Sequence, residues 1–171
     1  MKTKLTETIE IVDDDEVTIW RIDKGDGIVL INLNLLFDDC VSECEWLDDG
    51  HKLVQVMYSD WDSRELVAIV NTNGEILRKG INSIEVVLEK QKRLIVDMSG
   101  FGMGDDASDY FLEQDDTRMA VIDWHGDFVI DPLYYSIWFE ETENMFYAED
   151  TNGNELMFSI DGEPHKQENS N

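Results

Sequence analysis

Two segments of the chain share one pattern of hydrophobic and polar positions. In Val67–Leu77 an apolar run reaches a turn that ends at Gly74, and an apolar pair follows; Met119–Val129 repeats this pattern with Gly126 in the place of Gly74. The offset between the two segments is roughly 52 residues. Glycine supplies the positive φ that a tight hairpin turn needs, so each segment predicts a β-hairpin.

The same offset continues beyond the hairpins, and it aligns Gly80 with Pro132, Val86-Val87 with Trp138-Phe139, and Leu94–Asp97 with Phe146–Glu149. A fainter copy begins at Ile19, and a truncated copy is found at Leu156–Glu163. These repeats predict an all-β, mostly antiparallel fold of repeated β-hairpins and meanders. We expect a single β-rich repeat domain over residues 1–163 and a disordered tail over 164–171.

Helical periodicity is weak, with one exception in residues 33–47. There Leu36, Cys40, Cys44 and Leu47 follow one another at steps of three and four, which is the spacing of one helical face. A short helix is therefore one interpretation of this segment. A strand pair is the other, because the neighbouring run Leu53–Tyr58 favours a sheet.

The stretch Ala120–Ile137 resembles the WG-type repeat, in which an isoleucine-aspartate turn, a glycine, an apolar return strand, a proline and a tyrosine recur. The Trp-Gly pair that names the repeat is replaced by Thr117-Arg118, and by Glu65-Leu66 in the earlier copy, so the chain resembles a degenerate member. This resemblance implies a β-rich scaffold. In size and acidity the chain is also similar to immunity proteins of bacterial toxin systems.

The charge of the chain points to its partners. It has 39 Asp and Glu against 13 Lys and Arg, a formal net charge of -26 over 171 residues. Self-repulsion on this scale costs folding free energy, so we expect the acidity to serve binding of a basic protein. Nucleic acid is not an expected partner, because its binding depends on Lys and Arg that neutralise phosphates. Anionic membranes would be repelled as well.

The N-terminal residues and the cysteines indicate the compartment. Met1–Leu5 leads into Glu7 and Glu10 without an apolar stretch, so we expect no secretory signal and no membrane span, and a cytoplasmic location. Cys40 and Cys44 are expected to be free thiols in a reduced compartment.

The stretch from Ser99 to Asp116 is the strongest candidate for a site, because it combines glycines, aromatic residues and carboxylates in an unusually long connection. A phosphate cradle is not expected, since Asp105 replaces the third glycine of a dinucleotide fingerprint. We expect apolar anchors inside an acidic ring that binds a partner protein. A mobile loop or short helix with its aromatic residues in the core is the alternative. The expected partner-binding residues are Phe101, Asp105, Asp106, Asp109, Tyr110, Phe111, Glu113, Asp115 and Asp116.

No cofactor, metal site or catalytic residue is expected. Asp150, Asn152 and Asn154 have the alternate spacing of a calcium loop, but the glycine is misplaced, and a plain turn is the better interpretation. The histidines lie at turns or in the tail, with no obvious nucleophile beside them.

The sequence therefore predicts a non-enzymatic, acidic protein-binding module. Its most concrete form is an immunity or inhibitor protein that neutralises a basic nuclease toxin by covering the cationic active site. One alternative is a WG-repeat-like scaffold whose acidity only confers solubility. A less favoured alternative is a carboxylate-dependent hydrolase with aromatic pocket walls such as Trp61, Trp124 or Trp138.

Overall fold

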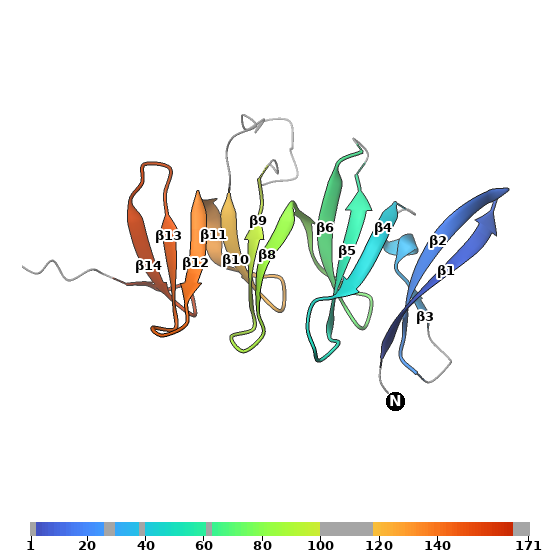
Figure 1. Cartoon of the computed structure of the whole chain (residues 1–171), viewed down its shortest axis with the longest axis horizontal. Helices are drawn as coiled ribbons and strands as arrows, with labels where there is room; N and C mark the ends of the chain where they lie inside the picture. The colour runs from blue at the N-terminus through green and yellow to red at the C-terminus, as the bar shows by residue number, and fades with distance from the viewer. Residues whose placement is uncertain (1–2, 26–29, 38–39, 61–62, 100–117, 166–171) are drawn as a thin grey trace, which may run out of the picture. The chain divides into compact units, whose positions relative to one another are not determined.

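The fold is all-β, as the repeats predict. A computed structural model describes residues 3–25, 30–37, 40–60, 63–99 and 118–165, and within them the chain forms antiparallel strands and one 3-10 turn (Figure 1). The chain divides into two compact units, Met1–Gly80 and Ile81–Asn171. The single domain over residues 1–163 stays a prediction.

The first unit contains two meandering sheets. Sheet A has the order β1-β2-β3, and sheet B has the order β4-β5-β6-β7. β1 and β2 form a long hairpin, in register from Lys4 opposite Asp23 to Val12 opposite Asp15. The elements are β1 (Lys4–Val12), β2 (Asp15–Asp23), β3 (Leu30–Asn32), η1 (Asn34–Leu36), β4 (Val41–Trp46), β5 (Leu53–Ser59), β6 (Glu65–Asn71) and β7 (Ile76–Ile81).

Residues 41–46 of the segment 33–47 form the strand β4, so the strand interpretation is confirmed. The only helical part of the segment within the described residues is the 3-10 turn η1, and β4 pairs with β5. Cys40 is exposed and Cys44 is buried, so the helix-like spacing does not mark one buried face, and β4 contains a β-bulge between Val41 and Glu43. The extra residue places Val41 and Cys44, three positions apart, both in the buried interior.

The second unit packs sheet C, in the order β11-β10-β9-β8, against sheet D, in the order β12-β13-β14-β15. Their shared core comprises Ile95, Met119, Val121, Ile130, Ile137, Phe146, Ala148 and Phe158. Tyr135 alone separates β11 from β12, so the chain passes directly from one sheet into the other. The strands are β8 (Ser83–Leu88), β9 (Arg93–Asp97), β10 (Met119–Asp123), β11 (Phe128–Tyr134), β12 (Ser136–Glu140), β13 (Met145–Glu149), β14 (Glu155–Ser159) and β15 (Pro164–His165).

The repeat seen in the sequence is also a repeat of backbone conformation. Gly74 and Gly126 both have positive φ, at 80° and 85°, in equivalent hairpin turns. Lys92 and Asn144, which the same offset aligns, have φ of 55° and 54° in the β8–β9 and β12–β13 turns. Because these non-glycine residues adopt the left-handed region at matching positions, the turns share one geometry.

Four hairpin turns use the same five-residue arrangement. The carbonyl of the first residue accepts a hydrogen bond from the N–H of the glycine at the fourth position. The N–H of the first residue donates to the carbonyl of the fifth. The side chain of the first residue also accepts hydrogen bonds from the N–H groups of the third and fifth. The turns predicted at Gly74 and Gly126 are therefore present, at Asn71–Glu75 and Asp123–Asp127, and the same turn recurs at Asp150–Asn154 and Ser159–Glu163.

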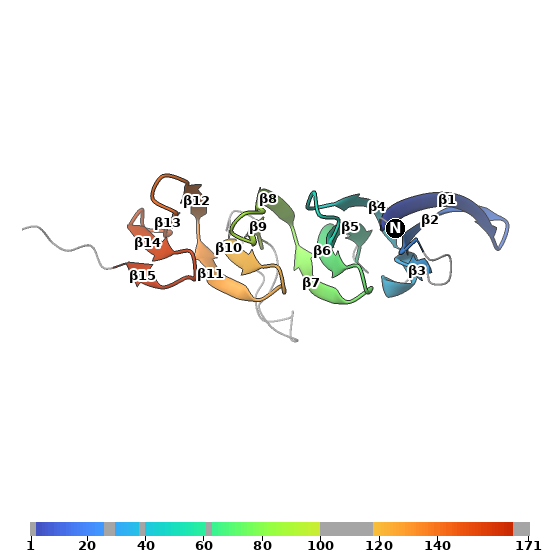
Figure 2. The ribbon, with the colours of Figure 1, turned by 90° about the horizontal axis from the view of Figure 1, so that it is seen from below.

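The end of sheet D is fastened to sheet C. The turn between β14 and β15 lies next to β11, where an added Cβ on Gly162 would meet the Val129 carbonyl oxygen (Figure 2). Arg93 of β9 forms an ion pair with Asp161 at 2.9 Å and donates to the Ile160 carbonyl at 3.0 Å. Pro164 and His165, the first residues of the expected tail, pair with β14.

Candidate partner-binding face

The structure does not describe the partner-binding residues expected from the sequence, because Phe101, Asp105, Asp106, Asp109, Tyr110, Phe111, Glu113, Asp115 and Asp116 lie outside the described residues. It does place the two ends of that segment. The Arg118 N–H donates to Ser99 Oγ at 3.0 Å, and the Met98 N–H donates to the Arg118 carbonyl at 2.8 Å. The residues that flank the segment are therefore adjacent, next to the paired ends of β9 and β10.

Of the acidic residues elsewhere in the chain, some are exposed and others cap turns. Asp13 and Asp14 are exposed at the tip of the β1–β2 hairpin, beside the exposed side chains of Ile11 and Val12. Asp48, by contrast, is only 5% exposed. Its Oδ1 accepts hydrogen bonds from two backbone N–H groups of the following turn, at 2.8 Å each. Asp48 is therefore a buried turn cap and not part of an exposed acidic surface.

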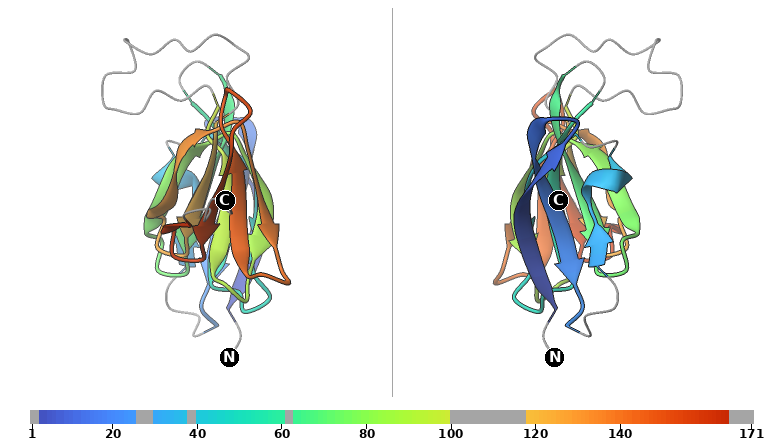
Figure 3. Two further views of the ribbon diagram at one scale, coloured as in Figure 1. Left: turned by 90° about the vertical axis from the view of Figure 1, so that its left-hand side faces the viewer. Right: turned by 90° about the vertical axis from the view of Figure 1, so that its right-hand side faces the viewer.

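The strands and turns of sheet D are strongly acidic. From Ser136 to His165 the chain has eight Asp or Glu residues and no Lys or Arg. Arg93 reaches this sheet from β9, but it is engaged by Asp161 and Ile160. A cationic group from another molecule would therefore meet little competition on this sheet. The left-hand view in Figure 3 is from the side of sheet D.

A row of large side chains crosses the outer face of sheet D. Trp138, Tyr147 and Met157 lie directly opposite one another on β12, β13 and β14, and we call them the Trp138 strip. The Trp138 and Tyr147 rings are stacked, with centroids 5.6 Å apart and planes 15° apart. Trp138 is 40% exposed. Their neighbours in sequence, such as Ile137 and Phe146, face the core instead.

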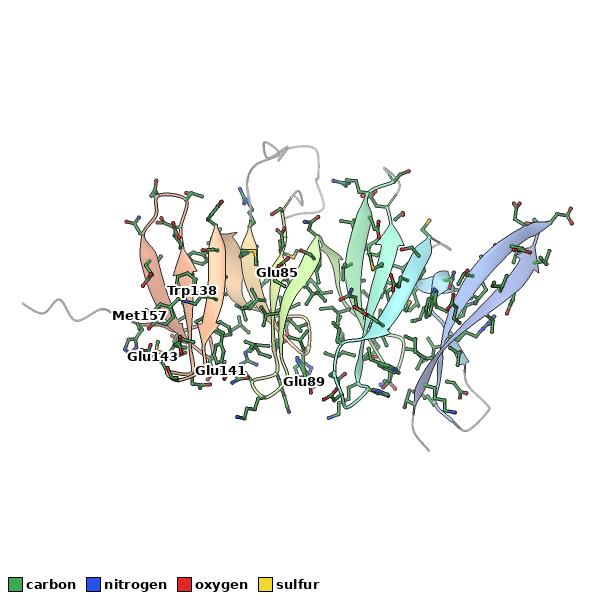
Figure 4. All side chains as sticks on the ribbon, viewed as in Figure 1. Glu85, Glu89, Trp138, Glu141, Glu143 and Met157 are labelled. Carbon is green, nitrogen blue, oxygen red and sulfur yellow. The ribbon has the colours of Figure 1, made fainter. Side chains whose placement is uncertain are left out.

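Carboxylates lie on both sides of the Trp138 strip. On one side, Glu149 and Glu155 are directly opposite one another on β13 and β14. Two like charges in that position repel each other. On the other side are Glu140, at the end of β12, and Glu143, which accepts a hydrogen bond from the Tyr147 hydroxyl. Figure 4 shows Trp138 and Met157 on the sheet with Glu143 in the adjoining turn.

These carboxylates change the chemistry of the Tyr147 hydroxyl. The hydrogen bond to Glu143 raises the pKa of Tyr147 from 10.0 to about 12, and the charges of Glu143, Glu155 and Glu140 add to this shift. Glu140 itself has a lowered pKa, because the side chain and backbone of Thr142 donate hydrogen bonds to its carboxylate. The strip therefore lies in a negative electrostatic environment that disfavours a further negative charge.

We predict that replacing Glu143 with glutamine lowers the pKa of Tyr147 from about 12 toward the ordinary 10.0, because the largest cause of the shift is removed. Ultraviolet titration of tyrosine ionisation, with Tyr147→Phe to identify the transition, measures it. The raised pKa also means that stability falls as pH rises between 10 and 12, where the unfolded chain loses this proton first. Glu163→Gln, in the exposed turn between β14 and β15, is the control; an equal shift there would contradict the local cause.

The calcium-like spacing at Asp150 belongs to a hairpin turn. The Asp150 carboxylate accepts hydrogen bonds from the backbone N–H groups of Asn152 and Asn154 and from the Asn154 side-chain amide, each at 2.8 Å. These bonds lower the pKa of Asp150. Among the residues that the structure describes, no group of three His, Cys, Asp or Glu side chains is arranged to hold a metal ion.

The Cys44 thiol is not suited to act as a nucleophile. Cys44 is a buried free thiol, and burial, followed by the charge of Glu43, raises its pKa to about 12. Such a thiol is a poor nucleophile.

A cavity of about 220 Å³ in the second unit is lined by residues 87–91 and Glu141, and none of these is aromatic. The aromatic pocket walls of the hydrolase alternative are not found there.

The chain matches no known family model, and no curated protein sequence matches it significantly. The resemblance to WG-type repeats therefore stays an expectation. No helix in the described part of the chain is long and apolar enough to cross a bilayer.

The alignment of Trp138, Tyr147 and Met157 on one face of sheet D was not predicted from the sequence. One sequence feature that could have indicated this face is the absence of Lys and Arg from the last strands, where aromatic residues and carboxylates remain frequent. The face on which Trp138 lies could not be read from Ile137-Trp138-Phe139, because three consecutive large apolar residues give no alternation.

Proposed function

We propose that this chain is an acidic protein-binding module whose partner is a strongly basic protein. Its most concrete form is an immunity or inhibitor protein that covers the cationic active site of a nuclease toxin. The main support is the outer face of sheet D, where exposed aromatic surface is bordered by carboxylates and the strands have no Lys or Arg. A net charge of -26 adds long-range attraction.

This composition fits recognition of a cationic surface. Buried aromatic side chains supply most of the affinity at interfaces, and surrounding charges supply specificity and association rate. Relief of the repulsion between Glu149 and Glu155 by a partner's cation would favour the complex over the free protein.

We predict that association with the basic partner slows about tenfold or more between roughly 20 and 150 mM salt, because exposed charges are screened. The partner is captured from the native host, and its nuclease activity is measured with and without one equivalent of this protein. Association rates are then recorded at both salt concentrations. Loss of nuclease activity together with a salt-dependent rate supports the proposal; a rate that does not change with salt contradicts it.

A pair of charge variants tests which surface is used. Glu149→Gln/Glu155→Gln removes two charges beside the Trp138 strip, and Asp13→Asn/Asp14→Asn removes two from the exposed hairpin tip. Both variants have the same net charge. We expect only the sheet D variant to slow association, by roughly threefold to tenfold. Equal slowing in both variants would show that overall charge, and not this face, attracts the partner.

A further inference from the structure

We infer that the Trp138 strip is a recognition site for arginine side chains of the basic partner, with a guanidinium group stacked on Trp138 and hydrogen-bonded to the flanking glutamates. The inference rests on the proposed function, and it adds the residue type that is recognised and the place where it binds. Neither the net charge nor the acidic clusters alone would distinguish arginine from lysine.

The shape of the strip favours a planar cation. Stacking on Tyr147 holds the Trp138 ring in one orientation, and 40% of Trp138 remains exposed. A planar cation gains both cation–π attraction and dispersion contact on such a surface, and Trp is the most favourable of the aromatic residues for it. The compact ammonium of lysine gains the first of these but cannot stack, and it is more strongly hydrated.

The position of the carboxylates also favours a guanidinium. Glu149 and Glu155 lie two residues further along the same strands that bear Tyr147 and Met157, and therefore on the same outer face. Glu140 and Glu143 lie at the opposite side of the strip. A guanidinium offers five N–H donors in a fixed plane, so while stacked it can donate sideways to a carboxylate.

Two other carboxylates of sheet D already have partners within the protein. Asp150 caps its turn, and Asp161 pairs with Arg93. The Glu149–Glu155 pair has no cation opposite it on β12, where the register places Ser136. An arriving cation would therefore be held next to the strip and not at Asp150 or Asp161.

Val86 provides a matched control in the same unit. The repeat offset aligns Val86 of β8 with Trp138 of β12, and both side chains are 40% exposed. Val86→Ala removes exposed apolar surface from sheet C, as Trp138→Ala removes it from sheet D. Only the tryptophan has a ring on which a guanidinium can stack.

The test is a titration of the whole protein with synthetic hexa-arginine and hexa-lysine peptides, followed by tryptophan fluorescence and calorimetry at constant salt. We expect hexa-arginine to bind about threefold to tenfold more tightly than hexa-lysine. Trp138→Ala should abolish this preference, Trp138→Phe should keep part of it, and Val86→Ala should leave it unchanged. Urea unfolding of each variant checks that the sheet is intact.

The outcomes separate this inference from the proposed function. If both peptides bind equally well and Trp138→Ala has no effect, the arginine site is wrong, although binding to basic proteins stands. If neither peptide binds but the captured host protein does, the arginine site is again wrong. If neither peptide binds and no basic protein is captured, both proposals are wrong.

Discussion

Replacing Gly162 with alanine is expected to destabilise the second unit by roughly 2–5 kcal/mol, because two costs combine. Gly162 has φ of +81°, a conformation that costs alanine free energy. An added Cβ would also lie 2.0 Å from the Val129 carbonyl oxygen and 3.0 Å from its carbonyl carbon. Both are backbone atoms of β11, so the turn must move away from the strand. Urea unfolding monitored by circular dichroism measures the loss.

Gly153→Ala separates these two costs. Gly153 occupies the same position of an equivalent turn, with φ of +79°, but its added Cβ would meet only the Glu149 carboxylate, at 3.8 Å. We therefore expect a loss of about 1–2 kcal/mol from backbone conformation alone. Equal losses for the two variants would mean that the contact between Gly162 and Val129 contributes nothing to stability.

Replacing Phe146 with alanine is expected to cost about 3–5 kcal/mol of unfolding free energy. Phe146 is fully buried on β13, within the core that sheets C and D share. Its ring lies 5.1 Å from that of Phe139, centroid to centroid. Truncation removes this contact and leaves a cavity that two hydrogen-bonded sheets cannot easily close. Hydrogen exchange should show faster opening in β9 and β10 as well as in β13, because the core is common to both sheets.

Phe146→Leu is the graded control, since it keeps most of the volume and should cost about 1.5 kcal/mol or less. Trp138→Ala, on the outer face of the adjacent strand, should cost less than Phe146→Ala because the lost side chain is partly exposed. If truncation of Phe146 were as mild as truncation of Trp138, the assignment of inner and outer faces of sheet D would be wrong.

The hairpins could be predicted from sequence because a turn is a local structure. Gly74, Gly126, Gly153 and Gly162 all have the positive φ that the turn signals required. The turn needs only a short apolar run on each side and a glycine at the fourth position, so nearby residues decide it. Net charge is likewise a property of composition, and it points to a basic partner whatever the fold.

The segment around Cys44 shows where local pattern fails. Its spacing fits one face of a helix, yet it forms a strand with a bulge. A bulge shifts the alternation of a strand by one residue, and only pairing with β5 reveals it. In the same way, the sequence could not show that Asp48 is a buried turn cap while Asp13 is exposed.

The sequence by itself thus determined the all-β class, the hairpin turns, the repeat and the acidity. Only the tertiary structure decided that Phe146 is buried while Tyr147 joins Trp138 on the outer face. Met145-Phe146-Tyr147 has no polar residue to mark a face, so the choice depends on how sheet D packs against sheet C. The candidate binding face exists because long-range packing buries one side of the sheet and leaves the other exposed.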